Sequence, residues 1–252
     1  MTQSLRFAVA GARGRMGQAV LKVLNERGFE VALAFDKGDV IDLSGADVVI
    51  DFTTPYASID IAHACADEGE KRGKALAHII GSTGWMPAEE QSLKTLTDRV
   101  TIVRAGNFSL GVNMLMGLVK QAAAKLPAED WDIEVLEAHH KRKVDAPSGT
   151  ALMLGQAAAI GREVDLGEAK VAARDGLTGQ RVDGTIGFSV IRGGGIIGEH
   201  SVLFASEDEI ITLSHSARDR TLFARGAIEA ALWAVGKPAG AYDMQDVLGF
   251  TA

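Results

Sequence analysis

The sequence is short of cysteine, of basic charge and of long apolar runs, and each shortage excludes a class of protein. A single cysteine, Cys65, among 252 residues leaves no partner for an internal disulfide, which favours a reducing compartment and a buried packing role for this side chain. No segment approaches the roughly 20 apolar residues that a membrane helix needs. The N-terminal segment also lacks the apolar stretch of a signal peptide. We therefore expect a cytoplasmic protein that does not act at a membrane.

Acidic side chains outnumber basic ones. There are 33 Asp and Glu against 26 Lys and Arg, a formal net charge of −7. This balance argues against a general nucleic-acid binder, although it leaves room for a local basic pocket. With 47% hydrophobic and 23% charged residues, the composition is that of an ordinary globular protein. The length fits one large domain or two small ones.

Short apolar runs alternate with amphipathic stretches through the first half of the chain. This alternation predicts a doubly wound, Rossmann-like parallel sheet with helices on both faces. Strands are predicted at 5–10, 31–35, 47–52, 75–80 and 100–104, and helices at 16–28, 59–68 and 89–98.

The pattern changes to α+β in the second half. Helices are predicted at 113–125 and 150–160, a strand at 132–137, and a final helix at 220–235. Three further runs, 185–191, 199–205 and 209–215, are predicted to be neighbouring strands of an antiparallel or mixed sheet. The glycines at 193–195 form a flexible break between the first two of these. We expect one domain at 1–108 plus 220–252 and a second at 109–219.

Three glycines stand between the first predicted strand and the first helix, in GARGRMG. Gly11, Gly14 and Gly17 would permit a tight turn and bring the backbone close to a pyrophosphate at the helix N-terminus. The spacing departs from G-x-G-x-x-G, but the position after the first strand favours dinucleotide binding over an ordinary turn.

Asp36 lies at the end of the second predicted strand, where a carboxylate can bind the adenosine ribose hydroxyls of NAD. Lys37 follows it, and Arg13 and Arg15 add positive charge to the glycine loop, which suits the 2′-phosphate of NADP. The sequence therefore predicts NADH or NADPH as cofactor and leaves the choice open. Two more loops, GSTGW at 81–85 and AGNFSLGVN at 105–113, follow predicted parallel strands and are candidates for the nicotinamide end.

The densest polar segment is EAHHKRKVDAPSGTA, from Glu137 to Ala151. If the preceding strand continues, alternation would place His139, Lys141 and Lys143 on one face. Ser148 is a plausible N-cap for the helix that follows, and a helix start with small and hydroxyl residues can bind a carboxylate. The alternative reading is a solvated basic face or a nucleic-acid patch. A metal site is not expected, because adjacent histidines on a strand do not both turn to one ion.

These motifs together resemble a known family. GARGRMG, DFTTP, GSTGW, AGNFSLGVN, EAHHKRKVDAPSGTA, RGGGIIGEH and YDMQDVLGF occur in order from end to end. The chain is similar to the 4-hydroxy-tetrahydrodipicolinate reductase (dihydrodipicolinate reductase) family, and HHKRKVDAPSGT is the most specific of the motifs. The resemblance implies NAD(P)H-dependent reduction of a small cyclic imine dicarboxylate, with loss of water, in lysine and diaminopimelate biosynthesis.

The resemblance also implies roles for individual residues. His139 is the expected proton donor and Lys143 a second donor, while His140, Ser148, Gly149 and Thr150 are expected to bind substrate. The second domain would bind substrate and form a homotetramer through its sheet. The expected cofactor contacts are Gly11, Ala12, Arg13, Gly14, Arg15, Met16, Asp36, Lys37, Gly81, Ser82, Thr83, Ala105, Gly106, Asn107 and Phe108.

Two other functions remain open at this point. Another two-domain NAD(P)-dependent dehydrogenase of oxo or imino acids would share the glycine loop without needing HHKRKVDAPSGT. A dinucleotide-sensing binding protein would need the loop but no acid in its second domain.

Overall fold

The computed structural model describes residues 5–250, and the chain divides into two compact units. The first contains the residues up to Leu110 together with those from Thr221 onward, and the second is Gly111–Arg220. The sequence places these boundaries after 108 and 219, whereas the structure places them after 110 and 220.

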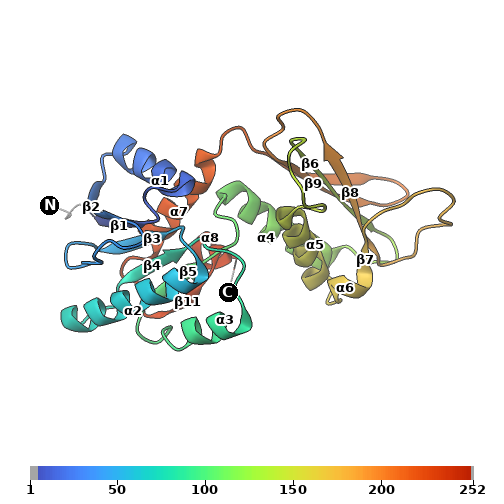
Figure 1. Cartoon of the computed structure of the whole chain (residues 1–252). Helices are drawn as coiled ribbons and strands as arrows, with labels where there is room; N and C mark the ends of the chain where they lie inside the picture. The colour runs from blue at the N-terminus through green and yellow to red at the C-terminus, as the bar shows by residue number, and fades with distance from the viewer. Residues whose placement is uncertain (1–4, 251–252) are drawn as a thin grey trace. The chain divides into compact units, whose positions relative to one another are not determined.

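The first unit is built on a six-stranded sheet in the order β11-β5-β4-β3-β1-β2, all of whose pairs are parallel (Figure 1). Its strands are β1 (Arg6–Ala10), β2 (Glu30–Phe35), β3 (Val48–Asp51), β4 (Ala77–Ile80), β5 (Thr101–Arg104) and β11 (Gly240–Tyr242). Its helices are α1 (Arg15–Glu26), α2 (Pro55–Arg72), α3 (Pro87–Lys94), α7 (Thr221–Ala234) and α8 (Met244–Leu248). The predicted Rossmann-like architecture is confirmed.

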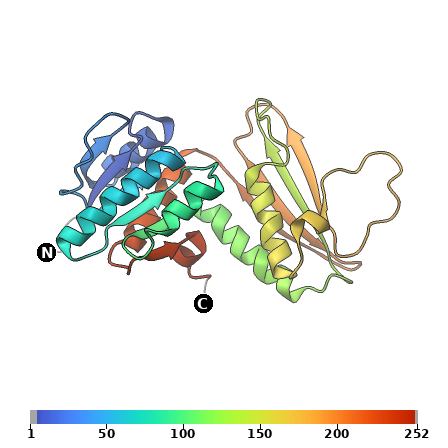
Figure 2. The ribbon, with the colours of Figure 1, turned by 60° about the horizontal axis from the view of Figure 1, so that its bottom comes forward.

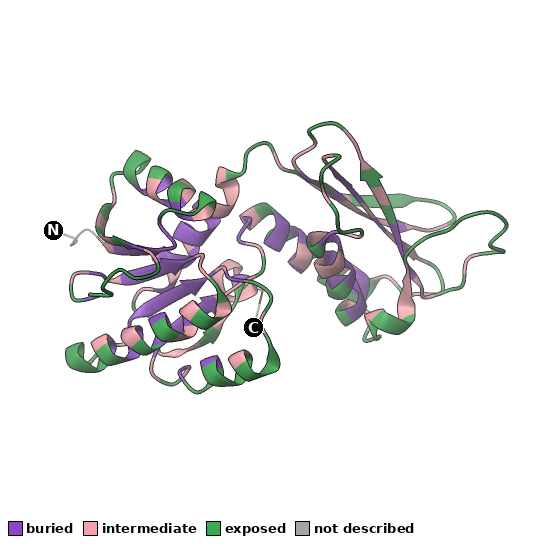
Figure 3. Cartoon of the chain, in the orientation of Figure 1, coloured by how far each residue is buried: buried purple, intermediate pink, exposed green. Residues whose placement is uncertain are grey.

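The two-residue period of the strands divides the core of this unit into two layers. On β1, Phe7 and Val9 belong to the cluster that packs against α1 and α7. Ala8 and Ala10, which point the other way, belong to the cluster on the side of α2 and α3. Because both faces of the sheet are covered, its strands are almost continuously apolar, as buried parallel strands are. The inner strands β1, β3, β4 and β5 are buried along nearly their whole length (Figure 3), whereas the edge strands β2 and β11 are partly exposed.

Some elements of the first unit differ from the sequence prediction. Helix α2 continues past Glu68 to Arg72, and Lys71 and Arg72 pair with Glu68 one turn back. Helix α3 ends at Lys94 rather than 98, where the hydroxyls of Thr95 and Thr97 donate to the carbonyls of Ser92 and Lys94 and a turn replaces the helix. The predicted final helix, α7, is followed by β11, an unpredicted edge strand, and by α8.

The second unit contains a mixed five-stranded sheet in the order β10-β9-β6-β8-β7. The strands are β6 (Asp132–His139), β7 (Lys170–Val171), β8 (Ile186–Arg192), β9 (Glu199–Ala205) and β10 (Ile210–Ser216). Helices α4 (Leu110–Lys125) and α5 (Gly149–Gly161) lie along one face of the sheet (Figure 2), and α6 (Leu166–Ala169) follows α5.

The pairing of these strands corrects one expectation. The runs at 185–191 and 199–205 are strands but are not neighbours, because β6 lies between them, parallel to β8 and antiparallel to β9. The glycines at 193–195 therefore do not make a hairpin. They carry the chain across the end of β6, where the Gly193 amide donates to the carbonyl of His139 at 2.9 Å.

No helix within residues 5–250 is long and apolar enough to cross a membrane.

Candidate active site

The loop between β1 and α1 holds backbone very close to backbone. Gly11 has a φ of 72°, in the left-handed region that favours glycine. A Cβ on Gly17 would lie 2.1 Å from the carbonyl oxygen of Gly11, so a side chain does not fit there. Gly14 caps α1 without a side-chain hydrogen bond, which leaves the first-turn amides of the helix for an anionic ligand. Of the other predicted loop residues, Ala12 is buried and Arg13 and Arg15 are exposed, while Met16 packs against the core.

Asp36 lies beside this loop and orders it. Its Oδ2 accepts a hydrogen bond from the Arg13 backbone N–H at 2.9 Å, and its Oδ1 accepts from the Lys37 N–H at 3.0 Å. These two backbone hydrogen bonds, the one from Arg13 first, hold the pKa of Asp36 below its ordinary value. The carboxylate is therefore ionised at neutral pH, as an acceptor for ribose hydroxyls must be.

A second acid, Asp39, was not singled out in the sequence. Its Oδ2 accepts from the Arg13 guanidinium at 2.7 Å and from the Asp36 backbone N–H at 2.8 Å. The Arg13 side chain is thus held toward two carboxylates, since its Nε also lies 3.7 Å from Asp36 Oδ2. Asp36 and Asp39 together offset the positive charge of Arg13.

The other two predicted cofactor loops leave the same edge of the sheet, because they follow the parallel strands β4 and β5. Gly81 faces the Phe52 ring so closely that a Cβ would lie 2.2 Å from it. Ser82 and Phe108 are buried, and Phe108 packs edge-on against Phe52. Thr83, Ala105, Gly106 and Asn107 are exposed or half-buried. Contacts from Phe108 to a cofactor would therefore come from its backbone.

Beneath the loop after β4 lies a buried polar pair that sequence reasoning missed. His78 Nε2 is 3.2 Å from Asp51 Oδ2, and both side chains are fully buried. Burial opposes ionisation of Asp51, but hydrogen bonds from His78, Ser58 and Thr53 outweigh it and lower its pKa. The hydroxyls of Ser58 and Ser82 are 2.9 Å apart, so this network reaches the loop. Cys65 is buried nearby, as expected, and burial raises the pKa of its thiol.

In the second unit, the polar segment turns back on itself immediately after β6. The strand ends at His139, and the Lys143 N–H donates to the carbonyl of His140 at 3.0 Å. The expectation that Lys141 and Lys143 continue the strand on the face of His139 is therefore wrong. Lys143 returns through the turn, and its Nζ lies 2.9 Å from Asp145 Oδ1.

His139 is buried at the end of β6 and is held by its neighbours. Its Nδ1 is 2.6 Å from Glu137 Oε2, and its ring lies edge-on to the His200 ring with 5.1 Å between centroids. On the far side of the ring, a Cβ on Gly198 would lie 3.2 Å from Nε2. The chain between β8 and β9 therefore packs directly over this histidine.

The start of α5 lies at the same cluster. Ser148 is the N-cap, and its Oγ accepts from the Ala151 N–H, as the sequence predicts. The same hydroxyl is 3.3 Å from His200 Nε2, while the Ser148 N–H donates to Glu137 Oε1 at 2.9 Å. Gly149 is exposed and Thr150 half-buried in the first turn, and His140 is half-buried after the strand.

Burial has a large effect on His200. Desolvation, helped by the positive charge that His139 can carry, lowers the pKa of His200 to about 4. His200 is therefore neutral at physiological pH. Glu137, Arg192 and His200 are the residues of this cluster to which the sequence assigned no role. Glu137 could have been found from the sequence, because it lies two residues before His139 on the same predicted strand. Arg192 and His200 could not, because they lie on β8 and β9, whose pairing with β6 the sequence does not show.

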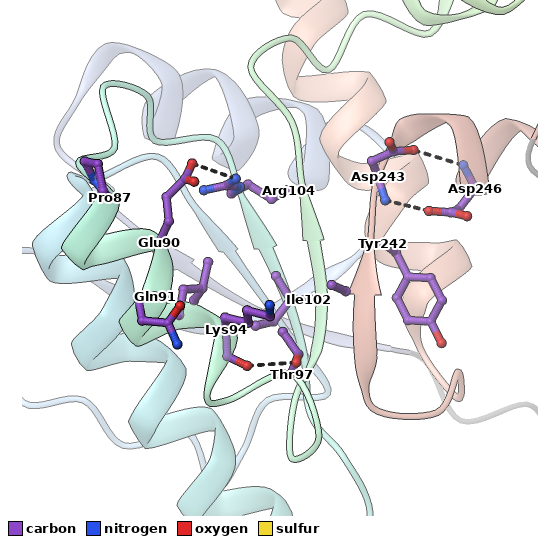
Figure 4. A pocket seen from close by; sticks show the side chains of 12 residues that line it. Pro87, Glu90, Gln91, Lys94, Thr97, Ile102, Arg104, Tyr242, Asp243 and Asp246 are labelled. Carbon is purple, nitrogen blue, oxygen red and sulfur yellow. Dashed lines mark hydrogen bonds and ion pairs between the residues drawn. The ribbon is translucent and has the colours of Figure 1, made fainter.

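The first unit also contains a cavity of about 770 Å³ between α3, β5, β11 and α8 (Figure 4). Glu90, Lys94, Arg104, Tyr242 and Asp246 are among its lining residues, and Arg104 pairs with Glu90 at 3.1 Å. None of the predicted cofactor or substrate residues lines it, so its size alone does not make it the reaction site.

Within the described residues 5–250, no three His, Cys, Asp or Glu side chains are grouped as metal ligands would be. A glycine-loop parallel sheet joined to a second unit with a buried histidine–glutamate pair beside a helix start defines the class of two-domain, nucleotide-dependent oxidoreductases.

Comparison with known proteins identifies the family within this class. The sequence model described as "Dihydrodipicolinate reductase, N-terminus" matches residues 5–108, and the one described as "Dihydrodipicolinate reductase, C-terminus" matches residues 111–248. The chain belongs to the dihydrodipicolinate reductase family. The predicted resemblance is confirmed.

Relatives of high similarity carry one name. The chain is 58% identical to the 4-hydroxy-tetrahydrodipicolinate reductase of Caulobacter vibrioides, with 99% of each chain covered. It is 47% identical to the 4-hydroxy-tetrahydrodipicolinate reductase of Allorhizobium ampelinum, covering 98% of this chain and 99% of that one. Among solved structures, a dipicolinate-bound dihydrodipicolinate reductase from Paenisporosarcina sp. TG-14 superposes with a TM-score of 0.74 at 23% identity, over 97% of this chain and 99% of that one. At that identity the superposition shows the shared fold.

Proposed function

We propose that this chain reduces 4-hydroxy-tetrahydrodipicolinate to tetrahydrodipicolinate in lysine and diaminopimelate biosynthesis. In this reaction the substrate loses water and gains one hydride from NADH or NADPH and one proton from the protein. The observation that carries the proposal is the buried His139 beside the start of α5, in a chain whose relatives are 4-hydroxy-tetrahydrodipicolinate reductases over their full length.

The chemistry assigned to the second unit follows from its residues. His139, as the imidazolium, donates the proton that neutralises the electron density left by hydride addition. Lys143 stabilises the same charge and serves as a second donor. The first-turn amides of α5, with Ser148, Gly149, Thr150 and the neighbouring His140, bind a substrate carboxylate. In the structure Lys143 forms an ion pair with Asp145. When the substrate binds, Lys143 leaves this pair and contacts the substrate.

The first unit is suited to a nicotinamide dinucleotide. Gly11 and Gly17 hold the loop at a closeness that side chains would prevent, and the first turn of α1 offers amides to a pyrophosphate. When bound, the cofactor supplies hydride to the substrate. Asp36 binds the ribose hydroxyls of NADH, and Lys37 favours the 2′-phosphate of NADPH. We therefore propose that both cofactors are used, within roughly tenfold of each other, or about 1.4 kcal/mol.

Assembly and location complete the proposal. The exposed apolar residues of the second sheet, Ile191, Ile210 and Ile211, support its role as the interface of a homotetramer. Besides further copies of the chain, the proposed partner is a small dicarboxylate substrate. We propose that the protein acts in the cytoplasm and binds neither nucleic acid nor a membrane. Analytical ultracentrifugation tests the assembly: a monomer at micromolar concentration would contradict it.

The activity is tested by mixing the protein with NADH or NADPH and substrate generated in place by the preceding synthase. We expect loss of reduced-nicotinamide absorbance only when the synthase product is present. No oxidation of either cofactor with fresh substrate would refute the proposed function.

A further inference from the structure

Glu137 is a buried carboxylate on β6 that accepts four hydrogen bonds from side chains and backbone of other elements and of its own strand. Its side chain is 1% exposed, and its two oxygens accept from three different groups. Oε2 accepts from Nδ1 of His139 at 2.6 Å and from one Arg192 nitrogen at 2.7 Å. Oε1 accepts from the Ser148 N–H at 2.9 Å and from the other Arg192 nitrogen at 2.7 Å.

This arrangement determines which nitrogen of His139 faces outward. Glu137 and His139 are two residues apart on β6, so their side chains share a face. An ionised carboxylate can only accept, so Nδ1 of His139 carries a proton. Nε2 is then the remaining nitrogen, on the side of Gly198, and is the atom that can gain or give a proton.

The carboxylate is ionised in spite of its burial. Burial alone raises its pKa, but hydrogen bonds from Arg192, His139 and the Ser148 backbone together hold the pKa of Glu137 below its ordinary value. Bidentate pairing with Arg192 also fixes the plane of the carboxylate. Arg192 in turn donates to the carbonyl of Asp145, in the turn that carries Lys143.

We propose that Glu137 is a positioning residue of the active site, which fixes the tautomer and orientation of His139. The inference rests on the proposed function, because it deepens the role given there to His139. The same carboxylate bonds the first residue of the α5 start, so one buried acid couples the orientation of the proton donor to the placement of the substrate-binding helix.

Other charged groups around the histidine do not take over this role. Arg192 on β8, Lys143 in the turn, and His200 and His215 on β9 and β10 are cationic or neutral. Asp145 is an acid, but its Oδ1 is paired with Lys143. Glu137 is therefore the carboxylate that holds Nδ1 of His139.

The substitution Glu137→Gln tests the proposal because it removes the charge and keeps the shape. Both oxygens of Glu137 accept from N–H donors, so in either orientation of the glutamine amide its NH₂ group faces a donor. Either His139 or the Ser148 N–H therefore loses its acceptor. We expect kcat to fall about 100-fold, the scale of a misplaced general acid, with a smaller change in the KM for substrate.

Glu134→Gln is the matched control. Glu134 lies on the same strand and pairs with Arg174 at 2.9 Å and with Arg181, but it has no contact with the histidine. We expect its kcat and its KM for substrate to match those of the wild type. A Glu137→Gln variant with wild-type kcat, or with a higher KM at unchanged kcat, would overturn the proposal.

A double-mutant cycle separates positioning from an independent structural effect. In a His139→Gln background, Glu137→Gln should change kcat by less than about threefold, because Glu137 acts through His139. A further loss as large as that in the wild-type background would show that Glu137 works by another route.

The wild-type protein provides a test that does not depend on turnover or on the folding of Glu137→Gln. A proton shared between Nδ1 of His139 and a carboxylate 2.6 Å away should resonate far downfield of the amide protons in an NMR spectrum. His139→Gln should remove this resonance and Glu134→Gln should keep it. Its absence from the wild type would refute the positioning role, whereas its presence in a protein that does not reduce the substrate would refute only the proposed function.

Discussion

The buried, neutral His200 makes a quantitative prediction about stability in acid. Its side chain lies between His139 and Ser148 and the residue is 5% exposed. Burial lowers its pKa from 6.5 to about 4. In the unfolded chain the imidazole binds a proton near its ordinary pKa, whereas in the folded chain it does so only in much stronger acid. The part of the unfolding free energy that depends on a neutral His200 is therefore fully present above about pH 6.5. It is lost progressively as the pH falls toward 4.

The size of the effect follows from the shift. The change from 6.5 to about 4 corresponds to about 3 kcal/mol when fully expressed, at about 1.4 kcal/mol for each pH unit. About 2 kcal/mol of this is lost by pH 5. For a protein whose unfolding free energy is on the order of 10 kcal/mol, that is a readily measured fraction.

The assay is urea unfolding followed by tryptophan fluorescence at pH 7.5, 6.5, 5.5 and 5.0. His200→Gln keeps a hydrogen-bonding group near Ser148 but cannot titrate. Its unfolding free energy should fall about 2 kcal/mol less than that of the wild type between the highest and lowest pH. His63→Gln, which removes an exposed histidine on α2, should follow the wild-type curve. Parallel pH dependence of the wild type and His200→Gln would refute the argument.

Four further results are expected. His139→Gln and Lys143→Ala should each lower kcat by about 10²–10⁴ with NADH affinity nearly unchanged, measured by steady-state kinetics and fluorescence titration; wild-type kcat in both would show that the donors were wrongly assigned. Asp39→Asn, by releasing the Arg13 guanidinium, should raise kcat/KM for NADPH relative to NADH by about 3- to 10-fold, on the scale of one surface ion pair, and an unchanged ratio would contradict the role of Asp39. Pyridine-2,6-dicarboxylate should inhibit competitively against substrate and should bind more weakly to Thr150→Val than to the wild type. Pyridine-2-carboxylate, with one charge fewer, should bind much more weakly than the diacid, and equal affinities in calorimetry would contradict the proposed carboxylate site. The Cys65 thiol, buried with a raised pKa, should react with a disulfide reagent only after denaturation, and rapid reaction in the native protein would mean that the region opens.

Local patterns in the sequence predicted much of this molecule. Four of the apolar runs became the inner strands β1, β3, β4 and β5, because a buried parallel strand has to be apolar on both faces. Ser148 caps α5, as its hydroxyl and the following helix-forming run indicate. These features depend on neighbours a few residues away, which a single sequence displays directly.

Features set by long-range pairing could not be predicted. The position of β6 between β8 and β9 determines that Arg192 and His200 meet Glu137 and His139, yet strand periodicity does not name the partner of a strand. The turn after His139 depends on the carbonyl of His140 accepting from the Lys143 N–H. Strand β11 is only three residues long, Gly240–Tyr242, and this is too short for an alternating or apolar pattern to be recognised.

The first unit is discontinuous in sequence, and this affects the order in which the chain folds on the ribosome. Its core includes side chains of α7 and α8, and its sheet ends with β11. All of these residues are synthesised after Arg220, when every residue of Gly111–Arg220 has already been made. Domains generally fold as units in the order of their synthesis. Here the unit with the first N-terminal residues is the last to be completed, so the nascent chain has every residue of Gly111–Arg220 before the core of the first unit can close.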